Sequence, residues 1–228
     1  PGLEGMTTPD DNQHTPIRTP IRTIVVQPTL ASYRVPVYRE LASRPQIDLR
    51  VWYGDQKAIR NATPEGFVAE SKPIHTWSFA GQEALWHSAQ LEAAGRDDAD
   101  AIVLGWSARY LSLGRALRRA SRAGKSVVLW GHGVSKCENA FRRWSRNRIT
   151  RHATALLFYD EVNAQAAVAH GAPADRVFVA PNALDQTAII AARDHWLARP
   201  DELEAFRQTQ GLVGRKVLLF VSRLTPEN

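Results

Sequence analysis

The sequence predicts an α/β fold: a doubly wound, mostly parallel sheet of the Rossmann-like type. From residue 23 onward, short apolar runs rich in branched side chains alternate with amphipathic stretches. That alternation is typical of parallel strands joined by crossover helices. The apolar runs have the length of strands, and none approaches the ~20 residues that a membrane-spanning helix needs.

The first half of the chain contains the weaker patterns. The run 23–27 is apolar, and 47–53 alternates between apolar and polar residues, so both are predicted strands. Pro36 fits the first turn of a helix over 33–42. Polar residues over 54–73 predict a loop, 74–79 a weaker strand, and the spacing of Leu85, Trp86, Ala89 and Ala93 a helix over 81–94.

The second half is more regular. Apolar runs predict strands over 101–105, 126–130, 155–159, 177–180 and 217–221. Helices are expected over 108–123, 138–152 and 161–170, the last closed by Gly171, and over 184–210 with a break at Pro200. The outer face of the helix over 108–123 is expected to carry Arg115, Arg118, Arg119 and Arg122.

These patterns divide the chain into four parts. Residues 1–22 are rich in Thr, Pro and Asp and are expected to be a disordered lead-in. Residues 23–184 can form one doubly wound domain. Residues 185–214 are expected to connect it to a second domain, of which 215–228 would be the opening.

The composition leaves several partners open. The 228 residues are 44% hydrophobic and 23% charged, with a net charge of +6. A basic balance suits nucleic acid, an anionic membrane surface or phosphate-bearing substrates. Cys137 is the single cysteine, so no internal disulfide can form. This and the polar first residues agree with a cytoplasmic protein. We interpret the glycosylation pattern at Asn61 as chance.

Ligands of doubly wound sheets bind beyond the carboxyl ends of the strands. The segment after the first strand offers hydrogen-bonding groups for a polyol or phosphate, at Thr29, Ser32, Tyr33 and Arg34. The alternative is that Ser32 caps the following helix and that its neighbours are merely exposed.

His132 follows a predicted central strand and stands between Gly131 and Gly133. Small neighbours would let another molecule approach the imidazole, which can bond a sugar hydroxyl or stabilise charge near neutral pH. A histidine that holds backbone groups of a turn is the alternative.

Other chemistries lack their sequence patterns. Neither GxGxxG nor GxxxxGK[ST] occurs, which argues against dinucleotide and P-loop phosphate cradles. No cluster has the spacing of metal ligands, so no metal or other cofactor is expected. Cys137 follows His132 by a few residues without a partner acid, and an inert thiol is favoured over a catalytic pair.

The predicted helix over 138–152 is basic and carries aromatic side chains. Such a helix suits an anionic bilayer surface. No nucleic-acid recognition fold is visible, so nucleic acid is not expected as a partner. A solvated face with Trp144 in the core is the alternative. The arginines concerned are Arg142, Arg143, Arg146, Arg148 and Arg151.

Motifs in order along the chain resemble family 4 glycosyltransferases of the GT-B fold. They include the opening strand and loop over 26–41, Val128-Leu-Trp-Gly-His-Gly133, Val177-Phe-Val-Ala-Pro-Asn-Ala-Leu-Asp185 and Val221-Ser-Arg-Leu-Thr-Pro-Glu227. The Pro-Asn-x-x-Asp pattern together with Arg-Leu is the specific part, since many doubly wound folds share the rest.

The resemblance implies a role for several residues. His132 would lie near the reacting sugar, Arg223 would grip the donor diphosphate, and Asn182 and Asp185 would form the hinge turn. Such enzymes are retaining, usually need no bound metal, and transfer sugars from nucleotide sugars to lipid-linked or polysaccharide acceptors, often at the inner face of the membrane.

The sequence departs from that family in several places. Ser222 stands where a glycine is usual and Asn228 where a second diphosphate-binding lysine is usual, and no glycine pair follows the first strand. The donor domain and its paired-glutamate motif do not occur in these residues, so the chain by itself is expected to be inactive.

Two other classes compete with the enzyme. A non-catalytic module that binds glycan or an anionic membrane would use the same loops and the basic helix. A flavodoxin-like regulator is less favoured, because Pro28-Thr-Leu30 stands where an acidic phosphoacceptor cluster would follow the first strand.

Overall fold

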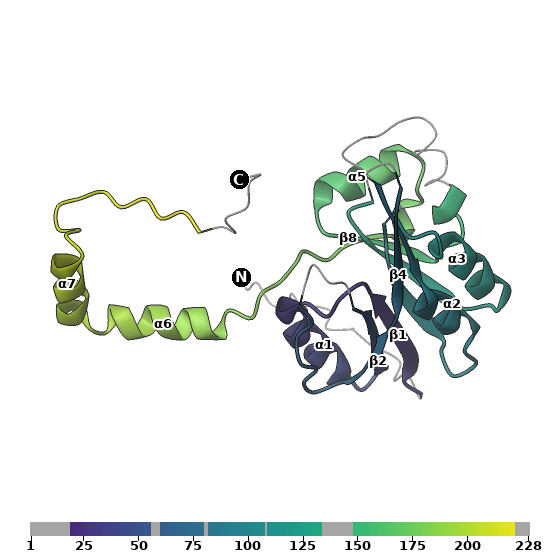
Figure 1. Ribbon diagram of the computed structural model, residues 1–228, viewed down its shortest axis with the longest axis horizontal. Helices are drawn as coiled ribbons and strands as arrows, with labels where there is room; N and C mark the ends of the chain where they lie inside the picture. Colours follow the sequence, from purple (N-terminus) through teal and green to yellow (C-terminus); the bar gives the residue numbers. More distant parts are fainter. Residues whose placement is uncertain (1–18, 56–59, 80–81, 108, 134–147, 222–228) are drawn as a thin grey trace, which may run out of the picture. The chain divides into compact units, whose positions relative to one another are not determined.

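One parallel sheet organises the chain up to residue 184 (Figure 1). The computed structural model describes residues 19–55, 60–79, 82–107, 109–133 and 148–221. Within them, seven strands pair in the order β3-β2-β1-β6-β7-β8-β9, and every pair is parallel. The strands are β1 (Ile21–Gln27), β2 (Ile47–Gly54), β3 (Val68–Lys72), β6 (Ala101–Gly105), β7 (Ser126–Gly131), β8 (Ala155–Phe158) and β9 (Val177–Val179).

The strand order reverses at β1. β2 and β3 extend the sheet on one side of it, and β6 to β9 extend it on the other. At such a switch point the two neighbouring connections leave in opposite directions, which opens a crevice beyond the carboxyl ends of the strands.

Both faces of the sheet are covered, which confirms the doubly wound prediction. Along β1, Val25 packs into one apolar core, whereas Ile24 and Val26 pack into the other. All three are at most 2% exposed. Burial on both faces explains why the central strands are continuous apolar runs in the sequence.

Helices cover both faces. α1 (Val35–Ala42), preceded by the 3-10 turn η1 (Ser32–Arg34), lies on one side, and α2 (Ser88–Gly95) and α3 (Leu113–Arg122) lie on the other (Figure 1). α3 buries Leu113, Ala116, Leu117 and Ala120. Its opposite face exposes Arg115, Arg118, Arg119 and Arg122, as predicted.

Residues 81–94 do not form the single helix that their spacing predicts. β4 (Ile74–Phe79) and β5 (Gln82–His87) form an antiparallel pair, and α2 begins only at Ser88. Leu85 and His87 are buried with the less buried Trp86 between them, which is the period of a strand. The amide of Leu85 donates to the carbonyl of Arg109, and the amide of Leu111 donates to the carbonyl of Leu85.

Those bonds also shorten the next helix. Residues 109–111 pair with Leu85 of β5 instead of joining α3, which begins at Leu113 and not at 108. The predicted loop over 54–73 likewise contains a strand, β3. β3 is the edge of the sheet and pairs with β2 alone, so its sequence VAESK needs no apolar pattern.

The rest of the first unit follows the predictions closely. α5 (Glu161–Ala169) begins at the N-cap Asp160, whose carboxylate accepts from the Asn163 amide, and Gly171 follows it with φ of +93°. A short turn, η2 (Ala174–Arg176), leads into β9. Most of the predicted helix over 138–152 lies outside the described residues.

Residues 185–228 form a second unit. It contains α6 (Thr187–Leu197) and α7 (Pro200–Thr209), so the predicted break at Pro200 is confirmed. The strand predicted over 217–221 is not formed, because no neighbouring strand pairs with it in the described part of the chain. Its side chains are exposed, Leu218 by 97%.

Candidate functional site

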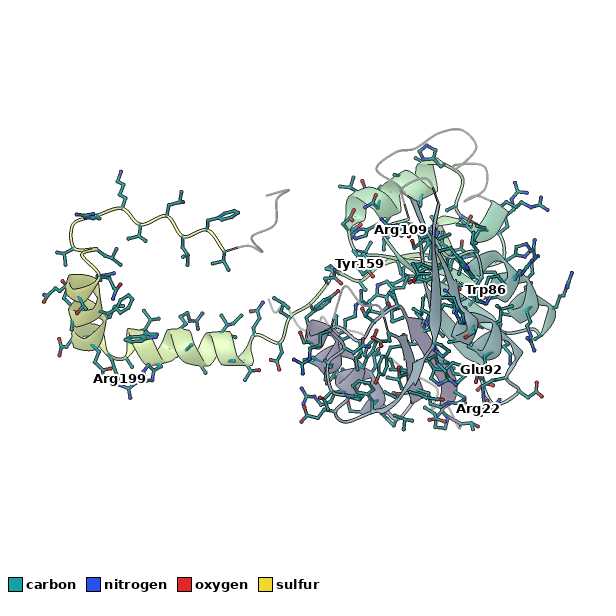
Figure 2. The ribbon with its side chains drawn as sticks, in the orientation of Figure 1. Arg22, Trp86, Glu92, Arg109, Tyr159 and Arg199 are labelled. Atoms are coloured by element: carbon teal, nitrogen blue, oxygen red, sulfur yellow. The ribbon has the colours of Figure 1, made fainter. Side chains whose placement is uncertain are left out.

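A cavity of about 320 Å³ opens beyond the carboxyl ends of the parallel strands. Residues that end or follow β1, β6, β7 and β8 line it together with Tyr33, Arg34 and Asn182. Figure 2 labels two of these lining residues, Arg109 and Tyr159. The cavity therefore lies where a doubly wound sheet places its ligand.

Arg34 forms the centre of an aromatic cluster in the wall of this cavity. Its Nη2 donates to the hydroxyl of Tyr159 at 2.6 Å, and its Nε donates to the hydroxyl of Tyr33 at 3.3 Å. The guanidinium carbon lies 4.2 Å from the centre of the Trp130 ring. A cation over an indole face is a favourable arrangement.

The charge of Arg34 is buried among neutral groups. The residue is 7% exposed. Burial opposes the charged form, but the phenol groups of Tyr38 and Tyr159 outweigh it, so the pKa of Arg34 is raised. Burial in turn raises the pKa of Tyr38 to about 12. Arg34 is thus a buried guanidinium surrounded by phenol groups.

Three buried donor atoms in the cavity wall have no hydrogen-bond partner among the described residues. They are Gln27 Nε2, Arg34 Nη1 and Trp130 Nε1. Buried polar groups are nearly always bonded, so unsatisfied donors that gather at one place need a physical reason. A ligand with acceptor oxygens would supply the bonds that they lack.

His132 stands at the end of β7, exposed, with its ring against Tyr159. The two ring centres are 4.7 Å apart and the planes are inclined by 60°. Hydrogen bonds from the amide and side chain of Asn163 lower the pKa of the neighbouring Asp160, with a smaller contribution from His132. The His132 ring therefore lies against an aromatic surface at the cavity.

The glycines beside His132 are also required by the packing of the protein itself. A Cβ on Gly131 would lie 2.8 Å from the carbonyl oxygen of Trp106. A Cβ on Gly133 would lie 2.4 Å from Cε1 of Phe158, and Gly133 has φ of +70°. A side chain at either position would therefore collide with neighbouring residues of the chain, although Gly131 itself lines the cavity.

The structure brings together part of the predicted site. Tyr33, Arg34, His132 and Asn182 all line the cavity. Thr29 is buried and Ser32 is exposed, and neither is among the lining residues. Asp185 belongs to the second unit, where its carboxylate accepts from the amide of Thr187 at 3.0 Å. Arg223 and Cys137 lie outside the described residues.

Sequence reasoning missed the aromatic part of the wall. Trp106 and Tyr159 each follow directly after a strand, β6 and β8, and Trp130 is the last residue but one of β7. Trp106 packs against Phe158 with ring centres 5.5 Å apart. The rule that locates ligands after strands would have found these residues if applied to every strand.

The basic helix is described only at its end. Arg142, Arg143 and Arg146 lie outside the described residues, and Arg148 and Arg151 are exposed. Within the described ranges, no helix combines the length and apolar character needed to cross a bilayer. The same ranges contain no group of His, Cys, Asp and Glu side chains arranged to hold a metal ion.

No family model matches the sequence, and no curated protein does. Solved structures do resemble the chain at low identity. UDP-GlcNAc 2-epimerase from Neisseria meningitidis bound to UDP-GlcNAc is 14% identical, with a TM-score of 0.49 over 83% of this chain and 54% of that one. Anabaena Alr3699/HepE in complex with UDP-glucose is also 14% identical, with a TM-score of 0.49 over 90% and 54%.

A third similar structure is UDP-GlcNAc 2-epimerase from Methanocaldococcus jannaschii, at 11% identity and a TM-score of 0.46 over 71% of this chain and 46% of that one. The chain thus spans about half the length of the solved structures that it resembles.

Proposed function

We propose that this chain is the acceptor-side domain of a retaining GT-B glycosyltransferase, which transfers a sugar from a nucleotide sugar to a hydroxyl of a lipid-linked or polysaccharide acceptor. The observation that carries the proposal is the cavity at the switch point of the sheet, with aromatic faces beside hydrogen-bonding side chains. Its volume of about 320 Å³ is at the small end of ligand pockets, which suits a sugar unit.

The wall has the chemistry that a sugar needs. A pyranose has an apolar face of C–H groups that packs on aromatic rings such as Trp106 and Tyr159, and a rim of hydroxyls. His132 and Asn182 can exchange hydrogen bonds with that rim. The arrangement orients an acceptor while the nucleotide sugar occupies a second domain that the proposal requires.

The family resemblance assigns His132 to the reacting sugar, and its position supports that role. It is exposed at the cavity and its ring is braced by Tyr159. His132→Ala should therefore lower turnover about 100-fold, the size of effect seen when one positioned hydrogen-bond group is removed, while stability stays unchanged. Arg223 as a diphosphate ligand and Asn182 with Asp185 as the hinge remain parts of the proposal.

The test is sugar transfer from a panel of nucleotide sugars by the longer protein that joins this domain to a donor domain. His152→Ala is the matched control, because His152 is also exposed but does not line the cavity. Full activity of His132→Ala would remove His132 from the site. Transfer by residues 1–228 alone would contradict the expectation that this chain is inactive by itself.

A non-catalytic module that binds anionic membrane or glycan is the second candidate, and the exposed face of α3 favours it. Residues 109–125 contain Arg109, Arg115, Arg118, Arg119, Arg122 and Lys125 and no acidic residue. Each basic residue near an anionic surface adds about 1 kcal/mol. Co-sedimentation with vesicles containing phosphatidylserine, compared with neutral vesicles, would reveal this binding.

A further inference from the structure

Arg34 is a buried cation whose partners in the described structure are all neutral. It donates to the hydroxyls of Tyr33 and Tyr159, and no carboxylate of the described residues forms an ion pair with it. Other arginines in the fold do have acids: Arg22 pairs with Asp100, for example. Burying a charge without a counter-charge is costly, and buried charges are normally paired.

Besides the phenol oxygens of Tyr33, Tyr38 and Tyr159, the surroundings of Arg34 contain donors that lack acceptors. Its own Nη1, the indole Nε1 of Trp130 and Nε2 of Gln27 lack acceptors. All three residues line the same cavity and are at most 9% exposed. A pocket with excess N–H groups and a net positive charge matches a ligand that carries several acceptor oxygens and a negative charge.

We propose that this Arg34 site binds a phosphate group of the ligand. The inference deepens the proposed function, because it assigns a phosphate-bearing substrate to the same cavity. The Nη1 of the planar guanidinium is the donor that no described residue bonds and that a phosphate oxygen would accept from, and the Trp130 face behind it fixes the plane of the guanidinium. The 3.3 Å bond to Tyr33 is the weaker of its two hydroxyl contacts and is the one that a charged oxygen would replace.

The phosphate has two possible sources, the acceptor and the nucleotide sugar. A phosphate-linked acceptor would place its phosphate at Arg34 and its sugar along Trp106 and His132. A donor would place its diphosphate there. Titrating the chain with inorganic phosphate, glucose 6-phosphate and UDP separates the sources, because the phosphate of glucose 6-phosphate is not on the anomeric carbon and so is not a fragment of a nucleotide sugar. Tighter binding of glucose 6-phosphate than of UDP assigns the site to the acceptor, and the reverse assigns it to the donor.

The decisive comparison is between the phosphate affinities of the unmodified chain and of two variants, each measured by calorimetry. Arg34→Gln should weaken binding by about tenfold or more, since a hydrogen bond to a charged group is lost. Arg22→Gln is the matched control: it removes the same charge at the opposite end of β1 and should bind like the unmodified chain. Equal binding by Arg34→Gln would overturn the proposal, as would an unmodified chain that binds none of the three probes.

A second measurement needs no variant. In the unmodified chain, the NMR signal of the Arg34 Nε–H group should shift as inorganic phosphate saturates its site. Phosphate binding that leaves this signal in place would overturn the assignment even if Arg34→Gln fails to fold. The outcome is independent of sugar transfer: an anion site without transfer activity would refute the enzyme, and transfer without phosphate binding would refute the site.

Discussion

The backbone of Leu30 is held by the side chain of Asn61, although 31 positions separate the two residues. The Leu30 amide donates to Asn61 Oδ1 at 2.7 Å, and the Asn61 side-chain amide donates to the Gly54 carbonyl at 3.2 Å. The neighbouring Ala62 amide donates to the Leu30 carbonyl at 2.7 Å. The loop that carries Tyr33 and Arg34 is thus tied to the end of β2.

Replacing Asn61 should loosen that loop. Asn61→Ala leaves the Leu30 amide without its acceptor and should lower the free energy of unfolding by about 1–3 kcal/mol. Thr63→Ala is the control, because it destroys the same glycosylation pattern at an exposed side chain and should change stability little. Urea denaturation measures both; equal losses would show that the Asn61 bonds do not stabilise the fold.

Trp130 should be the most sensitive aromatic residue of the cavity wall. It is 9% exposed and packs on both Arg34 and Tyr159. Trp130→Ala should lower the free energy of unfolding by about 3–5 kcal/mol. Trp77→Ala removes the same ring where it is 51% exposed and should have a much smaller effect in the same denaturation experiment. Similar losses for the two variants would contradict the packing described for Trp130.

Two separate features should make Gly133 hard to replace: its positive φ and the lack of space for a side chain. Gly124 shares only the first and serves as a control. The φ of Gly133 is +70°, and an added Cβ there would meet Phe158. Gly124 has φ of +67° with nothing within 4 Å of an added Cβ. Gly124→Ala should therefore show the backbone cost alone, about 1–2 kcal/mol, and Gly133→Ala a larger loss. If the midpoint of thermal unfolding falls equally in the two variants, the Phe158 side chain moves aside at no cost in stability.

His87 should make the fold sensitive to mild acid. It is fully buried, its Nε2 lies 3.2 Å from the Gln27 carbonyl oxygen, and burial lowers its pKa to about 4. In the unfolded chain the pKa is about 6.5, so the unfolded state binds a proton first as pH falls. The stabilisation that comes from keeping His87 neutral is fully present above pH 6.5 and is lost progressively between about pH 6.5 and pH 4.

Urea denaturation at several pH values checks this dependence. The full loss across the window is about 3 kcal/mol if His87 acts alone. His87→Gln should flatten the dependence between pH 6.5 and pH 4, although the variant is less stable at pH 7. Asp100 titrates lower, because the hydrogen bonds from Arg22 lower its pKa to about 2, so it contributes outside this window. An unchanged slope in His87→Gln would refute the assignment.

The central strands were predictable because both of their faces are buried. Residues 101–105, for example, form a continuous apolar run and are strand β6. β5 was not predictable from spacing, since Leu85, Trp86 and Ala89 also fit one face of a helix. What decides its structure is the backbone pairing with β4 and with residues 109–111, which depends on the tertiary fold.

In the candidate site, too, some residues were predictable from the sequence, and others depend on the tertiary fold. The segment after β1 indicated Tyr33 and Arg34, and the segment at the end of β7 indicated His132. That Tyr159 would bond Arg34 depends on the strand order, because the two residues are 125 positions apart and meet beyond the ends of β8 and β1, which lie three strands from each other. The packing requirement at Gly133 also depends on the tertiary fold, because Phe158, which an added Cβ would meet, follows it by 25 positions.

The central position of β1 in the sheet has a consequence for the order in which the parts of the protein unfold. β1 is bonded to β2 along its whole length and to β6 over Thr23–Val26. Its amides should exchange with deuterium on the slow timescale of global unfolding, whereas α6 and α7, which have no buried residues, should exchange early. The loop bearing Arg34 is therefore anchored to the last part of the molecule to lose its structure.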